Sequence, residues 1–215
     1  MGTSGQKRLV RKLDLERLLQ SIEAHPSPRA FLEQYTIPVD VASEMLLLAA
    51  YAHADIIGKT VADLGCGTGR LALGTVLLGA TEAVGIDIDK SAVKVAKDNA
   101  EKLNLKGKTS WIAGDIDVLH GNFDAVLQNP PFGVQKRKAD RKFLSKALEL
   151  APKIYSLHKS GKSNRAFIKK FIEGQGGKVT HIFQMKLSIP RLFKFHTKHK
   201  HEVEVDLYRI EVVGE

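Results

Sequence analysis

The feature that most constrains the fold of this chain is a strand-like stretch that leads into three alternate glycines and then into a helix. Residues 61–69 read VADLGCGTG, and a helical stretch follows from Arg70. Glycine permits a tight turn and lets a ligand approach the backbone. The spacing is G-x-G-x-G, whereas dinucleotide sites use G-x-G-x-x-G, and no Gly-Lys-Ser/Thr follows to form a phosphate loop. The turn therefore predicts a small-ligand site and disfavours a nicotinamide oxidoreductase.

Two carboxylates beside this turn indicate which ligand it holds. Asp63 directly precedes the glycines and suits an ammonium group, and Asp87 ends a second strand-like stretch, where it suits a ribose diol. An ammonium group and a ribose on one ligand indicate S-adenosylmethionine more than a dinucleotide. A structural alternative stays open, because Asp63 could cap the following turn and Asp87 with Asp89 could cap a helix.

The tetrapeptide Asn129-Pro130-Pro131-Phe132 follows another strand-like stretch, where α/β enzymes place their chemistry. The prolines fix φ and restrict the residues before them, so the turn is rigid. The Asn129 side-chain oxygen and the Pro130 carbonyl can accept both hydrogens of one amino group, and the Phe132 ring can stack on the attached base. These four residues are the predicted catalytic group of an amino methyltransferase. A proline turn without function is the structural alternative.

The tetrapeptide alone does not identify the amine. Adenine N6, cytosine N4, guanine N2 and a glutamine amide all place NH2 beside an sp2 carbon. Outside catalysis, the alternative is a methyltransferase-like module that only binds RNA. The joint presence of Asp63, Asp87, Asp115 and Asn129 argues against that alternative.

In these motifs the chain resembles the Rossmann-like class I methyltransferases, and more narrowly the archaeal and eukaryotic family that methylates adenine N6 of small-subunit ribosomal RNA. The motifs are EQY at 33–35, ADLGCG at 62–67, GIDID at 85–89, NPPFG at 129–133, YSLHK at 155–159, KFH at 194–196 and EVDL at 204–207. Residues 36–37 are Thr-Ile where eukaryotic members have Pro-Thr. The resemblance implies a cofactor site made of Gln34, Tyr35, Thr36, Asp63, Gly65, Cys66, Gly67, Thr68, Asp87, Ile88, Asp115, Ile116 and Asn129.

Alternating strand-like and helical stretches predict an α/β fold. We expect helices over 13–22, 38–53, 69–79, 90–103, 139–150 and 161–174, and strands near 60–64, 82–87, 109–113, 123–128 and 152–157. Two β-rich runs, 178–189 and 202–213, close the chain, and in the second run apolar residues alternate with charged ones. Together with the resemblance, this predicts a Rossmann-like seven-stranded methyltransferase sheet with helices on both faces and a C-terminal antiparallel hairpin. We expect one domain over 1–215, with residues 1–28 as an N-terminal helical extension.

Basic residues gather in two segments, 136–146 and 191–201, that flank the predicted site loops. The net charge of +9 favours contact with phosphate backbones. Aromatic residues interleaved with the second basic segment suit base stacking. A solvated charged surface is the alternative. The predicted RNA-binding residues are Lys136, Arg137, Lys138, Lys194, Phe195, His196, Lys198 and Lys200.

Length and composition limit the number of domains, the chance of a membrane span and the redox compartment that we expect. The 215 residues suit one domain with a sizeable core, and no apolar run reaches the length of a membrane span. The single cysteine, Cys66, predicts neither a disulfide nor a metal site, and it favours a reducing, cytoplasmic setting. The resemblance implies a small zinc-binding activator subunit as a partner besides RNA. The alternative among enzymes is a glutamine methyltransferase acting on a protein factor, for which Tyr is preferred at position 132.

Overall fold

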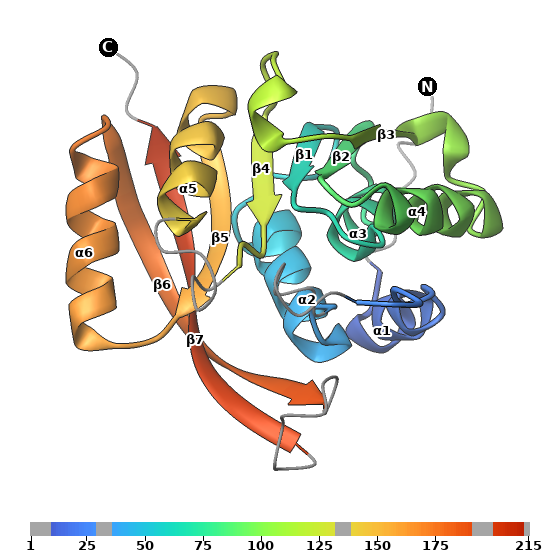
Figure 1. The fold of residues 1–215 in the computed structure, drawn as a ribbon, viewed down its shortest axis with the longest axis horizontal. Helices are drawn as coiled ribbons and strands as arrows, with labels where there is room; N and C mark the ends of the chain where they lie inside the picture. Colours follow the sequence, from blue (N-terminus) through green and yellow to red (C-terminus); the bar gives the residue numbers. More distant parts are fainter. Residues whose placement is uncertain (1–9, 29–35, 132–138, 191–199, 213–215) are drawn as a thin grey trace, which may run out of the picture.

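The centre of the molecule is one seven-stranded sheet in the order β3-β2-β1-β4-β5-β7-β6 (Figure 1). The computed structural model describes residues 10–28, 36–131, 139–190 and 200–212. The parallel strands are β1 (Thr60–Leu64), β2 (Glu82–Asp87), β3 (Thr109–Ala113), β4 (Ala125–Gln128) and β5 (Lys153–Lys159). The strand β7 (Lys200–Val212) runs antiparallel to β5 and to β6 (Gly177–Pro190). The predicted sheet and its terminal hairpin are therefore confirmed.

Helices cover both faces of this sheet, as predicted. Parallel strands need crossover connections, which helices supply here. The helices are α1 (Lys12–Gln20), α2 (Val39–Leu47), α3 (Arg70–Leu77), α4 (Lys90–Lys102), α5 (Ala139–Leu150) and α6 (Lys162–Glu173). Shorter helical turns span Leu48–Ala52, Lys106–Lys108 and Ile116–Val118.

Two apolar cores lie on opposite faces of the sheet. One core joins α1, α2 and α3 to the sheet through residues such as Leu19, Leu46 and Leu73. The other joins α5 and α6 to the opposite face through residues such as Leu144 and Ile168. Because both faces are covered, the parallel strands are apolar along most of their length, as buried parallel strands usually are.

The helix α4 begins and packs as its local sequence predicts. Asp89 precedes it, and Asp89 Oδ1 accepts a hydrogen bond from Ser91 N at 2.8 Å. Val93, Ala96 and Ala100 are buried on one face of the helix. The cap and the apolar stripe are those that the sequence predicts.

Two elements differ from the sequence prediction. The helix expected over 38–53 is α-helical only to Leu47 and continues as the π-helical turn Leu48–Ala52. In β7 the expected alternation of apolar and charged residues does not separate buried from exposed side chains, since Asp206 and Arg209 are both buried. Other elements cover the two faces of β7, since Asp206 contacts Arg165 of α6 on one face and Arg209 contacts Asp55 on the other.

Each buried charge of β7 has an ionic partner from a distant part of the chain. Arg209 Nη2 lies 2.9 Å from Asp55 Oδ2, and Tyr155 Oη donates to the same oxygen at 2.7 Å. Asp206 accepts two hydrogen bonds from Arg165 of α6, at 2.7 and 2.8 Å. The pairing compensates for the loss of hydration of these charges.

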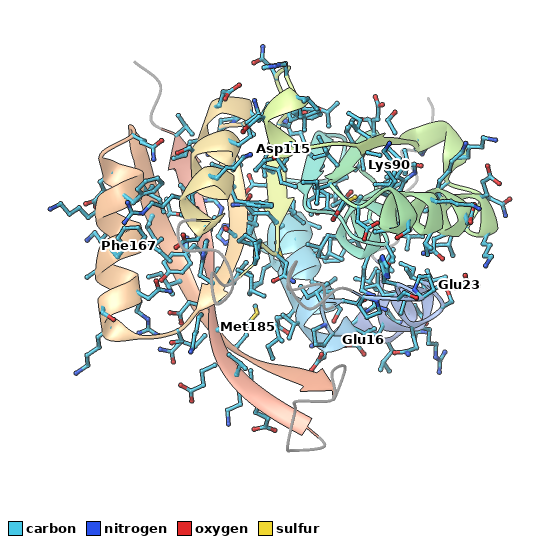
Figure 2. The ribbon with its side chains drawn as sticks, viewed as in Figure 1. Glu16, Glu23, Lys90, Asp115, Phe167 and Met185 are labelled. Carbon is cyan, nitrogen blue, oxygen red and sulfur yellow. The ribbon has the colours of Figure 1, made fainter. Side chains whose placement is uncertain are left out.

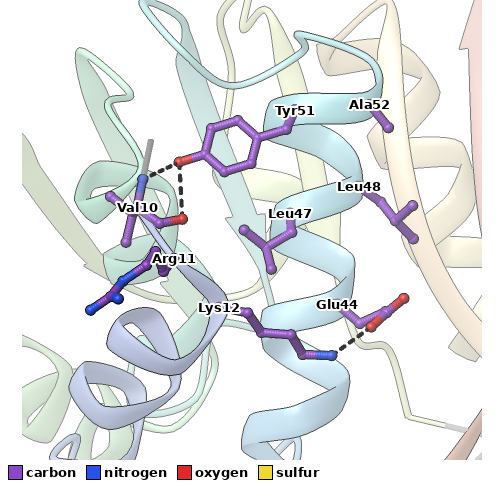
Figure 3. Close-up of a pocket in the computed structure, with 8 residues that line it drawn as sticks. All are labelled: Val10, Arg11, Lys12, Glu44, Leu47, Leu48, Tyr51 and Ala52. Atoms are coloured by element: carbon purple, nitrogen blue, oxygen red, sulfur yellow. Dashed lines mark hydrogen bonds and ion pairs between the residues drawn. The ribbon is translucent and has the colours of Figure 1, made fainter. Parts of the chain in front are cut away.

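The N-terminal helix α1 packs on α2 and α3. A pocket of about 410 Å³ remains between α1 and α2 (Figure 3). At one end of the pocket Val10 N donates to Tyr51 Oη at 2.8 Å, and near its other end Lys12 Nζ pairs with Glu44 Oε2 at 2.9 Å. Among the residues that the structure describes, no helix is long and apolar enough to cross a membrane.

Candidate cofactor and catalytic site

The glycine loop after β1 is hydrogen-bonded to the end of β2. Gly65 N and Cys66 N both donate to Ile86 O, at 2.9 and 3.0 Å. The backbone has positive φ angles at the three alternate glycines, 70° at Gly65, 54° at Gly67 and 89° at Gly69. These angles explain why the turn needs glycine, and the bonds fix the loop at the carboxyl ends of β1 and β2.

The glycines also make room for other groups. A Cβ atom on Gly69 or on Gly85 would lie 2.5 Å from the ring of Trp111, so the indole can pack directly beneath the loop. A Cβ on Gly67 would have no described atom within 4 Å. Gly67 therefore presents an open stretch of backbone that a ligand can approach.

Asp87 links the two strand ends. Its Oδ2 accepts from Gly67 N and its Oδ1 accepts from Asp89 N, both at 2.9 Å. Burial raises the pKa of Asp87, while the two backbone hydrogen bonds act in the opposite direction. The carboxylate is only partly buried, and each of its oxygens has a further lone pair for a ligand hydroxyl.

Asp63 lies beneath the loop and is 2% exposed. Its Oδ2 accepts from Ala72 N at 2.9 Å, in the first turn of α3. The capping alternative for Asp63 therefore describes a real contact. Burial raises the pKa of Asp63 to about 7, and the negative charge of Asp87 adds to this effect. The protonation state of Asp63 therefore determines the charge beneath the loop.

Further residues of the predicted cofactor site, Ile88, Asp115 and Ile116, follow β2 and β3. Gly114 N donates to Asp87 O at 2.9 Å, which brings the loop after β3 to the end of β2. Asp115 lies in this loop (Figure 2), where its Oδ1 accepts from Asp117 N and contacts Lys142 Nζ of α5. Ile116 is buried, and Ile88 is 56% exposed although it is apolar. An exposed isoleucine beside Asp87 offers an apolar surface to a ligand.

Asn129 follows the last residue of β4. Leu64 pairs with Gln128 in the sheet, so Asn129 lies where the glycine loop begins on the neighbouring strand. Its Oδ1 is buried and accepts no hydrogen bond from any described residue. Pro130 is buried and Pro131 is partly buried. The structure thus brings Asn129 to the same edge as Gly65, Asp87 and Asp115.

Other predicted cofactor residues lie in or near the loop. Cys66 and Thr68 are buried, and burial raises the pKa of the Cys66 thiol well above its usual range. Thr36 is partly buried. Among the described residues, no group of His, Cys, Asp and Glu side chains could hold a metal ion.

Several predicted residues lie outside the described part of the chain. They include Gln34 and Tyr35 of the cofactor site, Phe132 of the catalytic group, and most of the predicted RNA-binding residues: Lys136, Arg137, Lys138, Lys194, Phe195, His196 and Lys198. Lys200 begins β7, where only its backbone is described. These assignments stay predictions.

Contacts between the N-terminal segment and the cofactor loops were not expected. Asn99 of α4 is 2% exposed, and its Oδ1 accepts from Glu23 N at 3.0 Å. Its Nδ2 donates to Glu23 O at 3.2 Å and to Thr68 O at 3.1 Å. Glu23 lies near the end of α1 (Figure 2). An asparagine on the apolar face of a predicted helix is the sequence signal that could have revealed this contact.

Two further contacts join residues that precede β1 to the surroundings of the predicted cofactor loops. His25 Nε2 lies 3.3 Å from Asp89 Oδ2, next to the loop that holds Asp87. Arg70 Nη1 donates to Ile37 O at 2.6 Å from the start of α3. The N-terminal segment is therefore anchored to both predicted cofactor loops.

A family comparison decides what kind of site this is. The family model described as "Methyltransferase small domain" matches residues 36–164, which include the glycine loop, Asp87, Asp115 and Asn129. The chain belongs to this methyltransferase family. Membership implies S-adenosylmethionine as the methyl donor, in agreement with the sequence prediction.

Similar proteins cover nearly the whole methyltransferase. An uncharacterised protein of Methanocaldococcus jannaschii is 43% identical over 96% of both chains. The protein named rRNA N(6)-adenosine-methyltransferase Mettl5 of Drosophila melanogaster is 36% identical over 92% of this chain and 95% of its own. The crystal structure of a candidate RNA methyltransferase from Pyrococcus horikoshii has a TM-score of 0.89 and 42% identity, over 96% of this chain and all of that one. These similarities confirm the predicted resemblance to the family of archaeal and eukaryotic ribosomal RNA methyltransferases.

Proposed function

We propose that this methyltransferase transfers a methyl group from S-adenosylmethionine to adenine N6 of small-subunit ribosomal RNA. The observation that carries the proposal is the buried Asn129 Oδ1, which has no donor among the described residues. A buried acceptor left without a hydrogen bond is unfavourable by about 1 to 3 kcal/mol. A substrate amino group would supply the missing donor. The similarity to the fly enzyme named for rRNA N6-adenosine methylation supports adenine as the base.

The described residues fit the proposed cofactor. Gly67 presents open backbone, Asp87 has lone pairs for the ribose hydroxyls, and the exposed Ile88 offers an apolar face for the adenine ring. The Asp63 carboxylate lies beneath the loop, where its ionised form would attract the ammonium group. When bound, S-adenosylmethionine supplies an electrophilic methyl group on a sulfonium.

The catalytic residues act by holding the amine. The nitrogen lone pair of an exocyclic amine is delocalised into the ring, so attack requires the NH2 group to be turned and held in line. Asn129 Oδ1 and the Pro130 carbonyl would accept its two hydrogens, and these fixed dipoles would also stabilise the ammonium that develops. As the new nitrogen–carbon bond forms, the methyl–sulfur bond would break and a neutral thioether would leave. The ammonium that results has an acidic proton that water can accept, so no dedicated base is needed. Phe132 would stack on the base, which must leave its helix to reach the site.

RNA contact would come from the two basic segments that hold the predicted RNA-binding residues. The net charge of +9 supports electrostatic attraction to RNA, and binding should weaken steeply with salt. Among the described residues, β3 and β6 are the two edge strands of the sheet, and the edge of β3 would be the docking site of the proposed activator subunit. We place the protein in the cytoplasm, where its single buried cysteine would stay reduced.

The test is transfer of tritiated methyl groups from S-adenosylmethionine to separate RNA, DNA and protein fractions, followed by nucleoside and amino-acid analysis. The proposal predicts label in N6-methyladenosine of small-subunit ribosomal RNA. Label in methylglutamine of a protein would support the glutamine methyltransferase instead. Absence of transfer to any fraction, with and without a zinc-binding activator subunit, would favour the module that only binds RNA.

A further inference from the structure

The sheet face beneath α5 and α6 changes from apolar to polar as it approaches Asn129. Paired residues of β4, β5 and β7 form rows across this face. One row consists of Val126, Ile154 and Ile210, all fully buried. The next row toward the carboxyl end of β4 consists of Gln128, Ser156 and Tyr208, which are equally buried. His158 and Asp206 form a pair beyond them. The polar rows begin where the catalytic turn begins.

Three of these polar side chains form a hydrogen-bonded chain that starts at the residue before Asn129. Gln128 Nε2 donates to Ser156 Oγ at 2.9 Å, and Ser156 Oγ lies 2.7 Å from His158 Nε2. Because the serine hydroxyl already accepts from Gln128, and no other described group accepts its proton, it donates to His158 Nε2. His158 is therefore a neutral acceptor with its proton on Nδ1. Burial supports this state, since it lowers the pKa of His158 to about 3, although Asp206 opposes the shift.

The far end of this chain is packed against β7 and α6. The His158 ring meets the Tyr208 ring edge-on, with centroids 5.6 Å apart. Asp206 faces His158 in the strand register and is held by the bidentate contact with Arg165. Buried side chains from Gln128 to Asp206 thus connect the end of β4 with Arg165 of α6, which is itself partly exposed.

Stability alone does not explain these polar residues. Hydrogen bonds roughly compensate for the burial of polar groups, and apolar side chains pack well one row away on the same face. Gln128 Oε1 even lacks a hydrogen-bond partner among the described residues. What the chain does provide is a fixed side-chain position for Gln128. A fixed Gln128 sets the orientation of the strand end that carries Asn129.

We propose that Gln128, Ser156 and His158 are positioning residues that hold the Asn129-Pro130 turn in the orientation needed for methyl transfer. The inference rests on the proposed function, since it assigns a role in turnover at the same site. It also assigns a role to His158, in the YSLHK motif at 155–159. In the described structure none of the three side chains hydrogen-bonds to Asp63, Asp87 or the glycine loop, so cofactor binding should not depend on them.

The test compares four variants of the full-length protein. Ser156→Ala breaks both hydrogen bonds, His158→Leu removes the acceptor, and His158→Gln keeps an acceptor at this position. Tyr208→Phe is the matched control on the same face, because the Tyr208 hydroxyl has no hydrogen-bond partner among the described residues. Single-turnover methylation of small-subunit ribosomal RNA, the cofactor Kd and the melting temperature are measured for each.

We expect Ser156→Ala and His158→Leu to slow methyl transfer by about 10-fold to 100-fold, since small misplacements of catalytic groups have effects of this size. The cofactor Kd should stay unchanged, and His158→Gln and Tyr208→Phe should retain most of the rate. Folded Ser156→Ala protein that methylates at the wild-type rate would overturn the positioning role but not the proposed function. Equal losses in His158→Gln and His158→Leu would overturn it too. Wild-type protein that transfers no methyl group would overturn both.

Discussion

Gly67 donates its amide hydrogen to Asp87 Oδ2 over 2.9 Å, so the middle of the glycine loop and the end of β2 form one hydrogen-bonded unit. The other carboxylate oxygen of Asp87 accepts from Asp89 N, at the start of α4. Asp87 therefore shapes the loop and presents lone pairs to a ligand at the same time. A substitution at this residue should therefore weaken cofactor binding more than it destabilises the fold.

Asp87→Asn should weaken cofactor binding by about 10-fold or more, since a hydrogen bond to a charged group contributes roughly 1.5 to 3 kcal/mol. Isothermal titration with S-adenosylmethionine measures the change. The matched control is Asp98→Asn on the exposed face of α4, which should bind like wild type. Equal affinities of the two variants would remove Asp87 from the cofactor site.

Asp63 should make stability depend on pH. Its pKa is about 7 in the fold and roughly 3.9 in the unfolded chain, so between these values the folded protein holds a proton that the unfolded chain has lost. The contribution of Asp63 to the free energy of unfolding is therefore fully present below pH 4 and is lost as pH rises to 7. Each pKa unit corresponds to about 1.4 kcal/mol.

Urea denaturation at several pH values tests this expectation. Asp63→Asn has no ionisable group at this position, so its stability relative to wild type should increase between pH 4 and pH 7. A constant difference between the two proteins over this range would show that Asp63 does not titrate as the structure indicates.

Asn99→Ala should both destabilise the protein and weaken cofactor binding. The change removes the donor of Thr68 O, a buried acceptor whose loss of a partner is unfavourable by about 1 to 3 kcal/mol. It also removes both partners of the Glu23 backbone, which is only partly buried. The control is Lys97→Ala, a substitution two residues before Asn99 on the exposed side of α4. A variant that loses stability but binds S-adenosylmethionine with wild-type affinity would separate the N-terminal segment from the cofactor site.

Arg209→Ala should lower the free energy of unfolding by about 3 to 5 kcal/mol, as expected when one partner of a buried ion pair is removed. Asp55 would lose its ionic partner, and Tyr155 would lose a neighbouring donor. Arg11→Ala breaks the exposed pair with Asp14 and should leave the stability almost unchanged, because solvent screens exposed pairs. Similar losses in the two variants, measured by chemical denaturation, would contradict the structural role of the buried pair.

Local signals in the sequence were enough to predict the strands and most of the helices, whereas the roles of the candidate site residues stay predictions. The glycine loop, the Asp89 cap and the proline turn each depend on neighbouring residues, so short motifs reveal them. The fold class is confirmed by the sheet order. The extent of the domain, residues 1–215, stays a prediction.

Features that depend on distant partners could not be predicted in the same way. Asn99 binds a backbone segment 76 residues away, and Arg209 binds Asp55 from 154 residues away. The burial of Asp206 and Arg209 depends on the groups that cover the two faces of β7, which the pattern of the strand alone does not show. The π-helical turn at Leu48–Ala52 lies within an apolar stripe that reads as regular helix.

The rate of methyl transfer by Asn129→Ala tests the central claim most directly. Single-turnover methylation of small-subunit ribosomal RNA is measured beside the cofactor Kd, with Asn122→Ala at an exposed loop position as the matched control. We expect the rate to fall by about 100-fold or more, by analogy with the loss of one oriented dipole from an active site, while the cofactor Kd stays near that of wild type. A folded Asn129→Ala protein that methylates as fast as wild type would contradict the proposed role of Asn129 as the acceptor that holds the amine.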